Sequence, residues 1–175
     1  MAKRAAGRQD VYPNRALFSV TLSAADTLTF QQIRFGMGVF QGTALIVNRI
    51  DWHVDQVSVS GMVSANDMIR VALTNRDDLA ALTPANMNVL VFKELMVVLD
   101  GTAANFIVLD TPFISDFSRL PGAGLIIPAN PLFIGATSEG IGAAITVHAV
   151  MYYQTKVLAD ADYIELVQSL IPLNI

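Results

Sequence analysis

The sequence predicts an all-β protein with a single domain, and three observations support this prediction. Most apolar residues alternate with polar ones at a period of two, which is typical of half-buried strands. The alternating stretches are separated by short clusters of Gly, Pro, Asn, Asp and Ser, which favour reversals of the chain. The length of 175 residues suits one domain, and no internal repeat indicates a propeller or a solenoid.

The first strands are expected close to the N-terminus. Residues 16–22 place four apolar side chains on one face, namely Ala16, Phe18, Val20 and Leu22. In the next stretch, TLTFQQIRF, the apolar parity changes between Phe30 and Ile33, which predicts a bulge at the two glutamines between them.

The remaining strands follow at short intervals. One long strand, or two, is expected over 43–61, with Ile46, Ile50, Trp52 and Val54 on one parity and Val57 and Val59 on the other. Further strands are expected at 68–73, 88–99, 105–109, 124–128, 132–136 and 143–158.

Two segments are predicted to contain helix. Residues 76–87 can hold a turn or two, because Leu79 and Leu82 are three residues apart. A C-terminal helix begins at Asp160, which can cap it, and no later element of the chain is left to cover its apolar stripe. That stripe is expected to dock in an apolar groove of the sandwich or of a neighbouring subunit, and it consists of Tyr163, Ile164, Val167 and Leu170.

The composition excludes several classes of protein. There is no cysteine, which excludes disulfides, zinc–thiolate sites and thiol nucleophiles. Although 53% of the residues are hydrophobic, no stretch approaches the roughly 18 uninterrupted apolar residues of a membrane helix. No apolar segment follows the charged start of the chain, so we expect synthesis in the cytoplasm and no secretion.

Charge is distributed unevenly along the chain. Residues 1–15 carry four basic residues and one acidic one, a net charge of +3, and the 7 basic and 14 acidic residues that follow give −7. The predicted organisation is therefore a basic arm (1–15), a β domain (16–159) and a helix with a tail (160–175). We expect the basic residues of the arm, Lys3, Arg4, Arg8 and Arg15, to contact a neighbouring subunit or an anionic partner.

One short segment has the residues for catalysis or metal binding. In the strand IDWHVD, the side chains of Asp51, His53 and Asp55 would share one face, and such a row could bind a divalent cation or orient a general base. The simpler interpretation is the polar, wet face of a half-buried strand. His148, the other histidine, is expected at a polar position on the outer face of the last strand or at an interface.

No catalytic residue is predicted. The glycine-rich stretches lack the third glycine or the lysine of nucleotide-binding motifs, and neither GxSxG nor HExxH occurs. No cofactor is expected either, although Asp77 with Asp78, or Asp100 with Asp116, could share a calcium ion at a subunit contact.

The order of these features resembles the single jelly-roll capsid proteins of icosahedral viruses and phages. The resemblance lies in the short basic arm, about eight punctuated strands, the long final strand with YYQTKVL, and the small C-terminal helix. It implies an eight-stranded antiparallel jelly-roll sandwich with a short C-terminal helix. It also implies a structural major capsid protein of the virion that self-assembles, in many copies, into an icosahedral shell enclosing the genome.

The basic arm departs from the pattern of this family. Coat proteins that package a genome alone resemble one another in having long arms dense in Arg and Lys, whereas this arm has four basic residues and the chain a net charge of −4. Such a shell would repel nucleic acid. We therefore expect a second coat protein, an internal membrane or a separate basic protein to face the genome, or the arm to link neighbouring subunits or to bind the viral genome weakly.

Two other functions fit the same sequence. One is a trimeric jelly-roll module that binds a receptor or a carbohydrate, like the head of a virus spike or tail fibre or a protein of the tumour-necrosis-factor kind. The other is a hydrolase or metal enzyme that uses Asp51, His53 and Asp55. Contacts around threefold axes alone would favour the trimer, because a shell also needs contacts around fivefold and twofold axes.

Overall fold

The computed structural model describes residues 12–35, 42–55, 67–96, 113–120, 124–129 and 131–169. Nine strands and one helix are formed by these residues: β1 (Asn14–Thr21), β2 (Thr29–Gln32), β3 (Thr43–Val54), β4 (Met68–Thr74), β5 (Val89–Met96), β6 (Phe113–Asp116), β7 (Leu125–Pro128), β8 (Phe133–Glu139), β9 (Thr146–Val157) and α2 (Asp160–Ser169). None of the helical segments described is long and apolar enough to cross a membrane.

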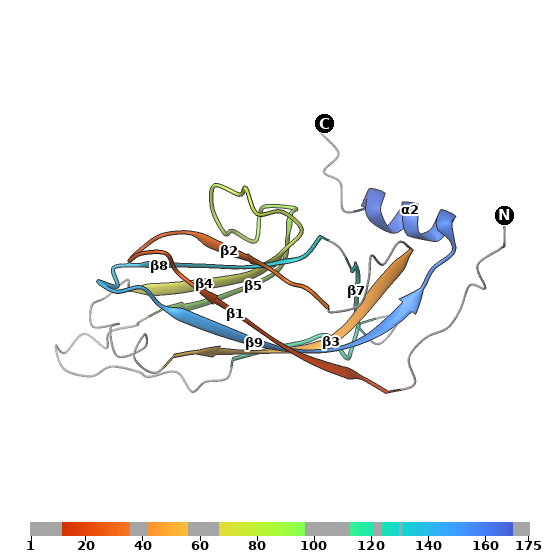
Figure 1. Cartoon of the computed structure of the whole chain (residues 1–175), viewed down its shortest axis with the longest axis horizontal. Helices are drawn as coiled ribbons and strands as arrows, with labels where there is room; N and C mark the ends of the chain where they lie inside the picture. The colour runs from red at the N-terminus through yellow and green to blue at the C-terminus, as the bar shows by residue number, and fades with distance from the viewer. Residues whose placement is uncertain are drawn as a thin grey trace.

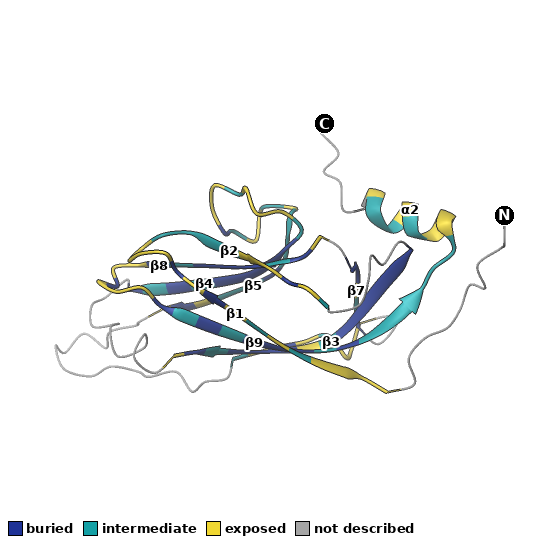
Figure 2. Ribbon diagram, viewed as in Figure 1, coloured by how far each residue is buried: buried dark blue, intermediate teal, exposed yellow. Residues whose placement is uncertain are grey.

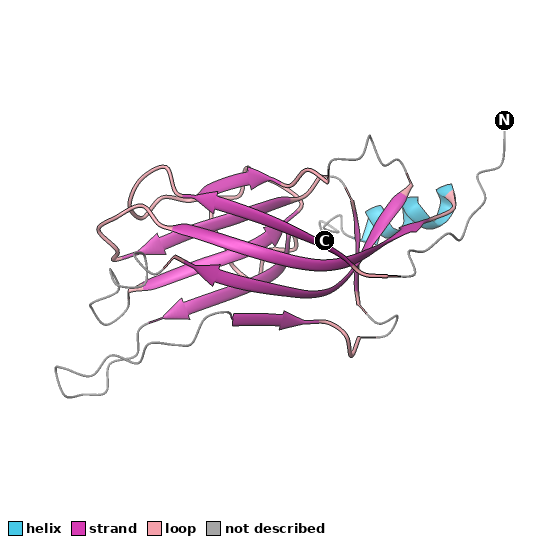
Figure 3. Ribbon diagram, turned by 60° about the horizontal axis from the view of Figure 1, so that its bottom comes forward, coloured by secondary structure: helices cyan, strands magenta, loops and turns pink. Residues whose placement is uncertain are grey.

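The strands form two antiparallel sheets that stack face to face, with α2 at one end (Figures 1 and 3). Sheet A has the order β1-β9-β3-β6, and β7 also pairs with β3; sheet B has the order β2-β8-β4-β5. β6 pairs with Arg49–Trp52 and β7 with Ala44–Val47, so the two are successive halves of one interrupted edge strand.

Counting β6 and β7 as one strand gives eight strands in the orders 1-8-3-6 and 2-7-4-5. This arrangement is the double-sheet jelly roll. The predicted fold class, an all-β jelly-roll sandwich with a short C-terminal helix, is therefore confirmed by the order of the strands itself.

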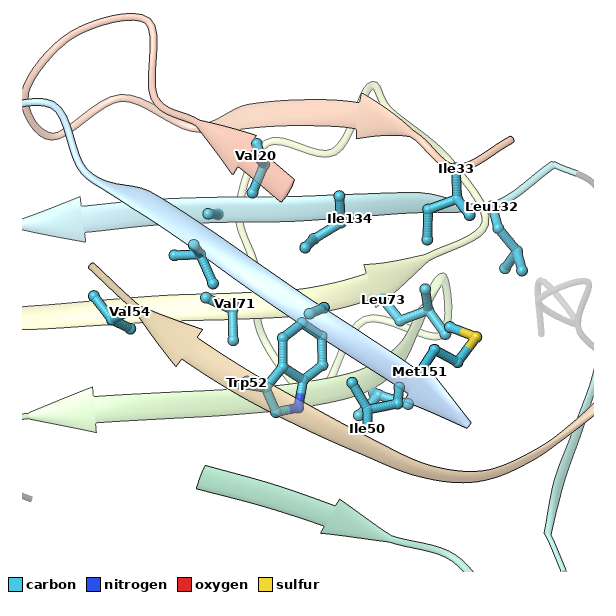
Figure 4. Packing of buried hydrophobic residues seen from close by; sticks show 14 of the residues in the cluster. Val20, Ile33, Ile50, Trp52, Val54, Val71, Leu73, Leu132, Ile134 and Met151 are labelled. Atoms are coloured by element: carbon cyan, nitrogen blue, oxygen red, sulfur yellow. The ribbon is translucent and has the colours of Figure 1, made fainter. Parts of the chain in front are cut away.

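The core lies between the sheets and is built from the alternate residues that face inward. Trp52 and Ile50 from β3, Met151 from β9, and Leu73 and Ile134 from sheet B are each at most 1% exposed (Figure 4). Burying a side chain of this size stabilises the fold by about 1.5–3 kcal/mol. These contacts fix which face of each strand points outward, and so determine what sheet A presents to solvent.

The polar atom of the buried Trp52 side chain has a hydrogen-bond partner. The indole Nε1 of Trp52 donates a hydrogen bond of 3.1 Å to the hydroxyl of Ser115 on β6. This bond ties the short edge strand to the centre of sheet A. It also offsets the cost of burying the indole N–H.

The long strand β3 differs from its predicted pattern at one position. Ile46 was predicted to share a face with Ile50 and Trp52, but a bulge between Val47 and Arg49 reverses the alternation. Leu45 and Val47 therefore face the core before the bulge, and Ile46 lies on the outer face. The stretch containing Val57 and Val59 lies outside the described residues.

The bulge predicted in β2 is wrong. The pairing of β2 with β8 continues without a shift in register through Gln32. Phe30 pairs with Gly135 on the outer face of sheet B, whereas Ile33 is buried in the core. The apolar parity changes because Phe30 packs beside Leu82 on the outer face of sheet B, whereas Ile33 beyond the end of β2 packs in the core.

The helix predicted at 76–87 is also wrong. These residues form turns and irregular structure between β4 and β5. Leu82 is 3% exposed and lies close to Gly135, so the loop covers the outer face of sheet B, over which it arches in Figure 1. The three-residue spacing of Leu79 and Leu82 reflects this packing.

Three smaller differences concern the ends and the middle of the chain. β1 begins at Asn14, so Arg15 belongs to sheet A although it was expected in the arm. β6, Phe113–Asp116, was not predicted, and the strand expected at 105–109 lies outside the described residues. In α2 the first hydrogen bond runs from the amide of Tyr163 to the carbonyl of Ala159, which places Ala159 at the cap and Asp160 in the first turn.

Candidate assembly surface

The outer face of sheet A is exposed along two of its edge strands, β1 and β6. The outer face of sheet B is covered in part by the loop that carries Leu82, and elsewhere it presents the ion pair of Arg70 and Glu94. On sheet A, Figure 2 shows much of β1 as exposed, whereas Val150 and Asp51 at the centre of the outer face are 5% and 6% exposed. The edges of this face are therefore available for contacts with another molecule.

One cross-strand row on this face is largely apolar, and we call it the apolar row. Direct register pairs connect β1, β9, β3 and β6, and the row consists of Leu17, Val150, Asp51 and Ile114. The two ends are open to solvent, since Leu17 is 65% exposed and Ile114 is 41% exposed. A second apolar pair on the same face, Ile46 opposite Ile126, lies beyond the bulge.

The neighbouring row is charged, and we call it the charged row: Arg15, Tyr152, Arg49 and Asp116. The guanidinium of Arg49 donates two hydrogen bonds to the carboxylate of Asp51, one of them 2.9 Å long. The same guanidinium lies 5.8 Å from the centre of the Tyr152 ring, a cation–π contact. The hydrogen bond to Asp51 raises the pKa of Arg49, so this side chain carries a permanent positive charge.

Asp116, at the end of the charged row, is fixed by its own turn. The backbone N–H of Ser118 donates a hydrogen bond of 2.9 Å to the Asp116 carboxylate and lowers its pKa. The positive charges of Arg119 and Arg49 lower this pKa further. The charged row therefore presents ionised groups of both signs next to the apolar row.

On the other side of the apolar row lies a polar row formed by Ser19, His148 and His53, which we call the histidine row. Both imidazoles are half-buried. At the end of the sheet, the hydroxyls of Thr21 and Thr146 are 3.0 Å apart and share a hydrogen bond. His148 thus lies on the outer face of the last strand, where the sequence predicted it.

The predicted row of Asp51, His53 and Asp55 does share one face, but it does not form a metal cluster. Trp52 and Val54, between them, face the core. Asp51 is 6% exposed and bound by Arg49, which leaves it unavailable to a cation or a substrate. Among the described residues, no three His, Asp or Glu side chains come close enough together to hold a metal ion.

Of the acidic pairs considered for a calcium ion, Asp77 and Asp78 lie on the loop between β4 and β5. Asp78 accepts hydrogen bonds from Arg76, one of them 2.8 Å long, and this contact lowers its pKa. Asp77 is exposed and Asp116 belongs to the charged row. Asp100 lies outside the described residues.

The C-terminal helix α2 contacts β7. Tyr163 and Val167 of the predicted docking stripe are half-buried, whereas Ile164 is 55% exposed. Leu170 lies outside the described residues, as do Lys3, Arg4 and Arg8 of the arm. The helix bears acidic residues in its first turn and no basic residue in its last.

A shallow groove opens between β1 and β2, where the edges of the two sheets meet. Its volume is about 480 Å³, and its lining is mostly polar: Phe18, Ser19, Thr21, Gln31, Gln32, Arg34 and Ile134. Amide, hydroxyl and guanidinium groups of this kind donate and accept hydrogen bonds without requiring a charged ligand.

Sequence reasoning missed the apolar row, although one signal was present. Leu17 lies between Ala16 and Phe18 and breaks the alternation of the first strand. An apolar residue on the polar parity of a half-buried strand faces solvent in the isolated chain. The partners of Leu17 in the row could not be found in this way, because they depend on the pairing of distant strands.

No protein-family model matches the sequence, and no curated protein matches it. Among solved structures, the chain is similar to the VP1 protein of Merkel cell polyomavirus, in a structure of that protein in complex with the GD1a oligosaccharide. The sequences are 8% identical, the TM-score is 0.47, and the match covers 89% of this chain and 99% of that one. The assignment of the jelly roll rests on the strand order described above.

Proposed function

We propose that this protein is a structural capsid protein whose copies associate through the outer face of sheet A and build a closed icosahedral shell. The observation that carries the proposal is the apolar row, which crosses four strands and ends in two exposed side chains, Leu17 and Ile114. A row with three aliphatic members out of four, flanked by charged and polar rows, is similar in composition to a protein interface with its polar rim.

The size of this face indicates that it acts together with other contacts. With strands about 4.8 Å apart and about 3.4 Å per residue, the outer face from the charged row to Thr21 covers about 300 Å². A stable interface needs roughly 800 Å² per partner. Helix α2, with Ile164 exposed, and the part of the basic arm that precedes β1 are the segments we propose to add the remaining area.

The proposal extends to the contents of the shell. A net charge of −4 per copy opposes direct binding of nucleic acid, because affinity depends on the number of phosphates neutralised by Lys and Arg. A second coat protein, a basic protein or an internal membrane would then lie between the shell and the genome. In the virion, the arm would bind a neighbouring copy in preference to the genome.

The substitution Leu17→Asp tests the role of this face. A carboxylate buried at a contact between copies would lose its hydration, so we expect assembled particles to be replaced by free subunits with unchanged thermal stability. Sedimentation velocity measures this distribution of sizes. Met87→Asp is the matched control, because Met87 is 55% exposed but lies on the loop between β4 and β5.

Assembly of Leu17→Asp to the same extent as the wild type would exclude the outer face of sheet A as the contact. Loss of assembly in both variants would mean that any added charge disrupts the particle, and would equally contradict a specific role of this face.

A second candidate function is the binding of a carbohydrate in the groove between β1 and β2. Its polar lining, with Gln31, Gln32 and Arg34 beside the ring of Phe18, suits the hydroxyls and apolar faces of a sugar. Glycan-array binding by the wild type, abolished by Gln31→Ala with Arg34→Ala, is the expected result. No binding by the wild type at millimolar glycan would contradict this candidate.

A further inference from the structure

The two histidines of the chain lie directly opposite each other in sheet A. His53 on β3 and His148 on β9 are register partners, and the chain has no other histidine. Both side chains point to the outer face, because Trp52 and Val54 on one strand, and Val147 and Ala149 on the other, face the core. Directly opposed residues of an antiparallel pair have their Cβ atoms about 4.5–5.5 Å apart.

The backbone at this pair is held firmly. β3 and β9 are the two twelve-residue strands of the sandwich and pair along nearly their whole length. The backbone N–H of Asp55 donates to the carbonyl of Thr146, so the pairing continues past the histidines. Side chains on such strands need only a choice of rotamer to meet, without movement of the main chain.

The described residues leave the ring nitrogens of both histidines available to a ligand. Neither imidazole makes a hydrogen bond or an ion pair with another residue in the described part of the chain, and each is half-buried. Two carboxylates flank His53 along its strand: Asp51 is held by Arg49, and Asp55 is exposed. The neighbour on β1 is the small hydroxyl of Ser19.

We propose that His53 and His148 form a two-histidine site for a divalent transition-metal ion, such as Cu²⁺, Ni²⁺ or Zn²⁺. Metal–nitrogen bonds of about 2.0–2.1 Å require the two nitrogens to come within about 4 Å of each other, which facing imidazoles on adjacent strands can do. These ions favour imidazole nitrogen as a ligand, whereas calcium and magnesium favour oxygen ligands. Water completes the coordination.

The inference does not rest on the proposed assembly, and it differs from the row of Asp51, His53 and Asp55 considered from the sequence. That row lies on one strand, and its first carboxylate is bound by Arg49. The site proposed here joins two strands, so its ligands are far apart in the sequence and adjacent in the sheet.

Titration calorimetry of the full chain with Cu²⁺ and with Zn²⁺ tests the site. We expect binding of one ion per chain, and an electron paramagnetic resonance spectrum of the Cu²⁺ complex with two nitrogen ligands. His53→Gln and His148→Gln should each weaken binding by about tenfold or more. Ser19→His should tighten Zn²⁺ binding, because it adds a third imidazole to the same row.

Three results would overturn the proposal. The first is a wild-type chain that binds neither ion at micromolar concentration. The second is unchanged affinity in both glutamine variants, which would put the ion elsewhere on the chain. The third is a Cu²⁺ spectrum without nitrogen ligands. Thermal denaturation of each variant checks that the sheet is intact, and the wild-type titration remains decisive if a variant does not fold.

Discussion

Gly135, on β8, lies where the loop between β4 and β5 packs on sheet B. A Cβ at this position would lie 2.8 Å from Cε1 of Phe30 and 3.2 Å from Cδ2 of Leu82. We therefore predict that Gly135→Ala lowers the free energy of unfolding by about 1–3 kcal/mol, because an extra methyl group overpacks the contact. Urea denaturation, followed by the fluorescence of the buried Trp52, measures the change.

Gly142 provides the matched control for this substitution. No atom lies within 4 Å of a Cβ built at Gly142. Gly142→Ala should therefore change the free energy of unfolding by no more than about 0.5 kcal/mol. Equal stability of the two alanine variants would show that the loop does not pack on Gly135 as described.

The environment of Asp116 allows the midpoint of its acid titration to be predicted. Its carboxylate is hydrogen-bonded by the backbone N–H of Ser118, which lowers its pKa. A lowered folded-state pKa stabilises the fold above the unfolded value of roughly 3.9, and this contribution is lost as the pH falls through the lower folded value. A carboxyl titration by NMR should give Asp116 a midpoint below the ordinary one.

Two substitutions of Ser118 separate the causes of this shift. Ser118→Ala keeps the backbone donor but removes the hydroxyl, which is the second cause of the lowered pKa, so the pKa of Asp116 should rise only in part. Ser118→Pro removes both donors and should bring this pKa closer to the ordinary value. An ordinary midpoint in the wild type would show that the turn after β6 does not hold the carboxylate.

At the level of single elements, helix α2 has a weak start. Ala159 occupies the cap, and alanine offers no side-chain acceptor to the free amides of the first turn. We predict that Ala159→Ser stabilises the helix by about 0.5–2 kcal/mol, seen as slower hydrogen exchange of its amides. Ala161→Ser, an exposed position inside the helix, is the control and should not slow exchange. Unchanged exchange in Ala159→Ser would mean that the helix starts elsewhere.

Strands in which apolar and polar residues alternate, so that one face is buried, could be predicted from the sequence. β1 and β4 fall where 16–22 and 68–73 were expected, because one side of each strand meets the core and the other meets solvent or polar neighbours. β6 could not be predicted in this way. It has four residues, and its stability comes from pairing with β3 and from the bond between Ser115 and Trp52.

Local features that depend on packing between layers were predicted incorrectly. The spacing of Leu79 and Leu82 indicated a helix, but Leu82 is buried because its loop crosses sheet B. A bulge was predicted because Phe30 and Ile33 lie on opposite faces of their strand. Phe30 is apolar on the outer face because it packs beside Leu82 of this loop. The bulge near Asn48 in β3 left no signal, because apolar residues lie on both sides of it.

For the whole molecule, the fold class could be predicted from the sequence, but not which residues lie next to one another on the surface. The jelly-roll order was expected from a family resemblance, and the strand order now confirms it. The apolar row and the pair of His53 and His148 exist only because β1, β9, β3 and β6 lie side by side. The period-two pattern gives the face of each residue but not its partner on the next strand.

Assembly of copies of this chain into a closed shell through sheet A can be observed by cryo-electron microscopy of the purified full chain at high concentration. We expect closed particles of uniform size, with copies in contact around fivefold and twofold axes and with Leu17 and Ile114 buried between them. Monomers, or trimers with the outer face of sheet A open to solvent, would contradict it.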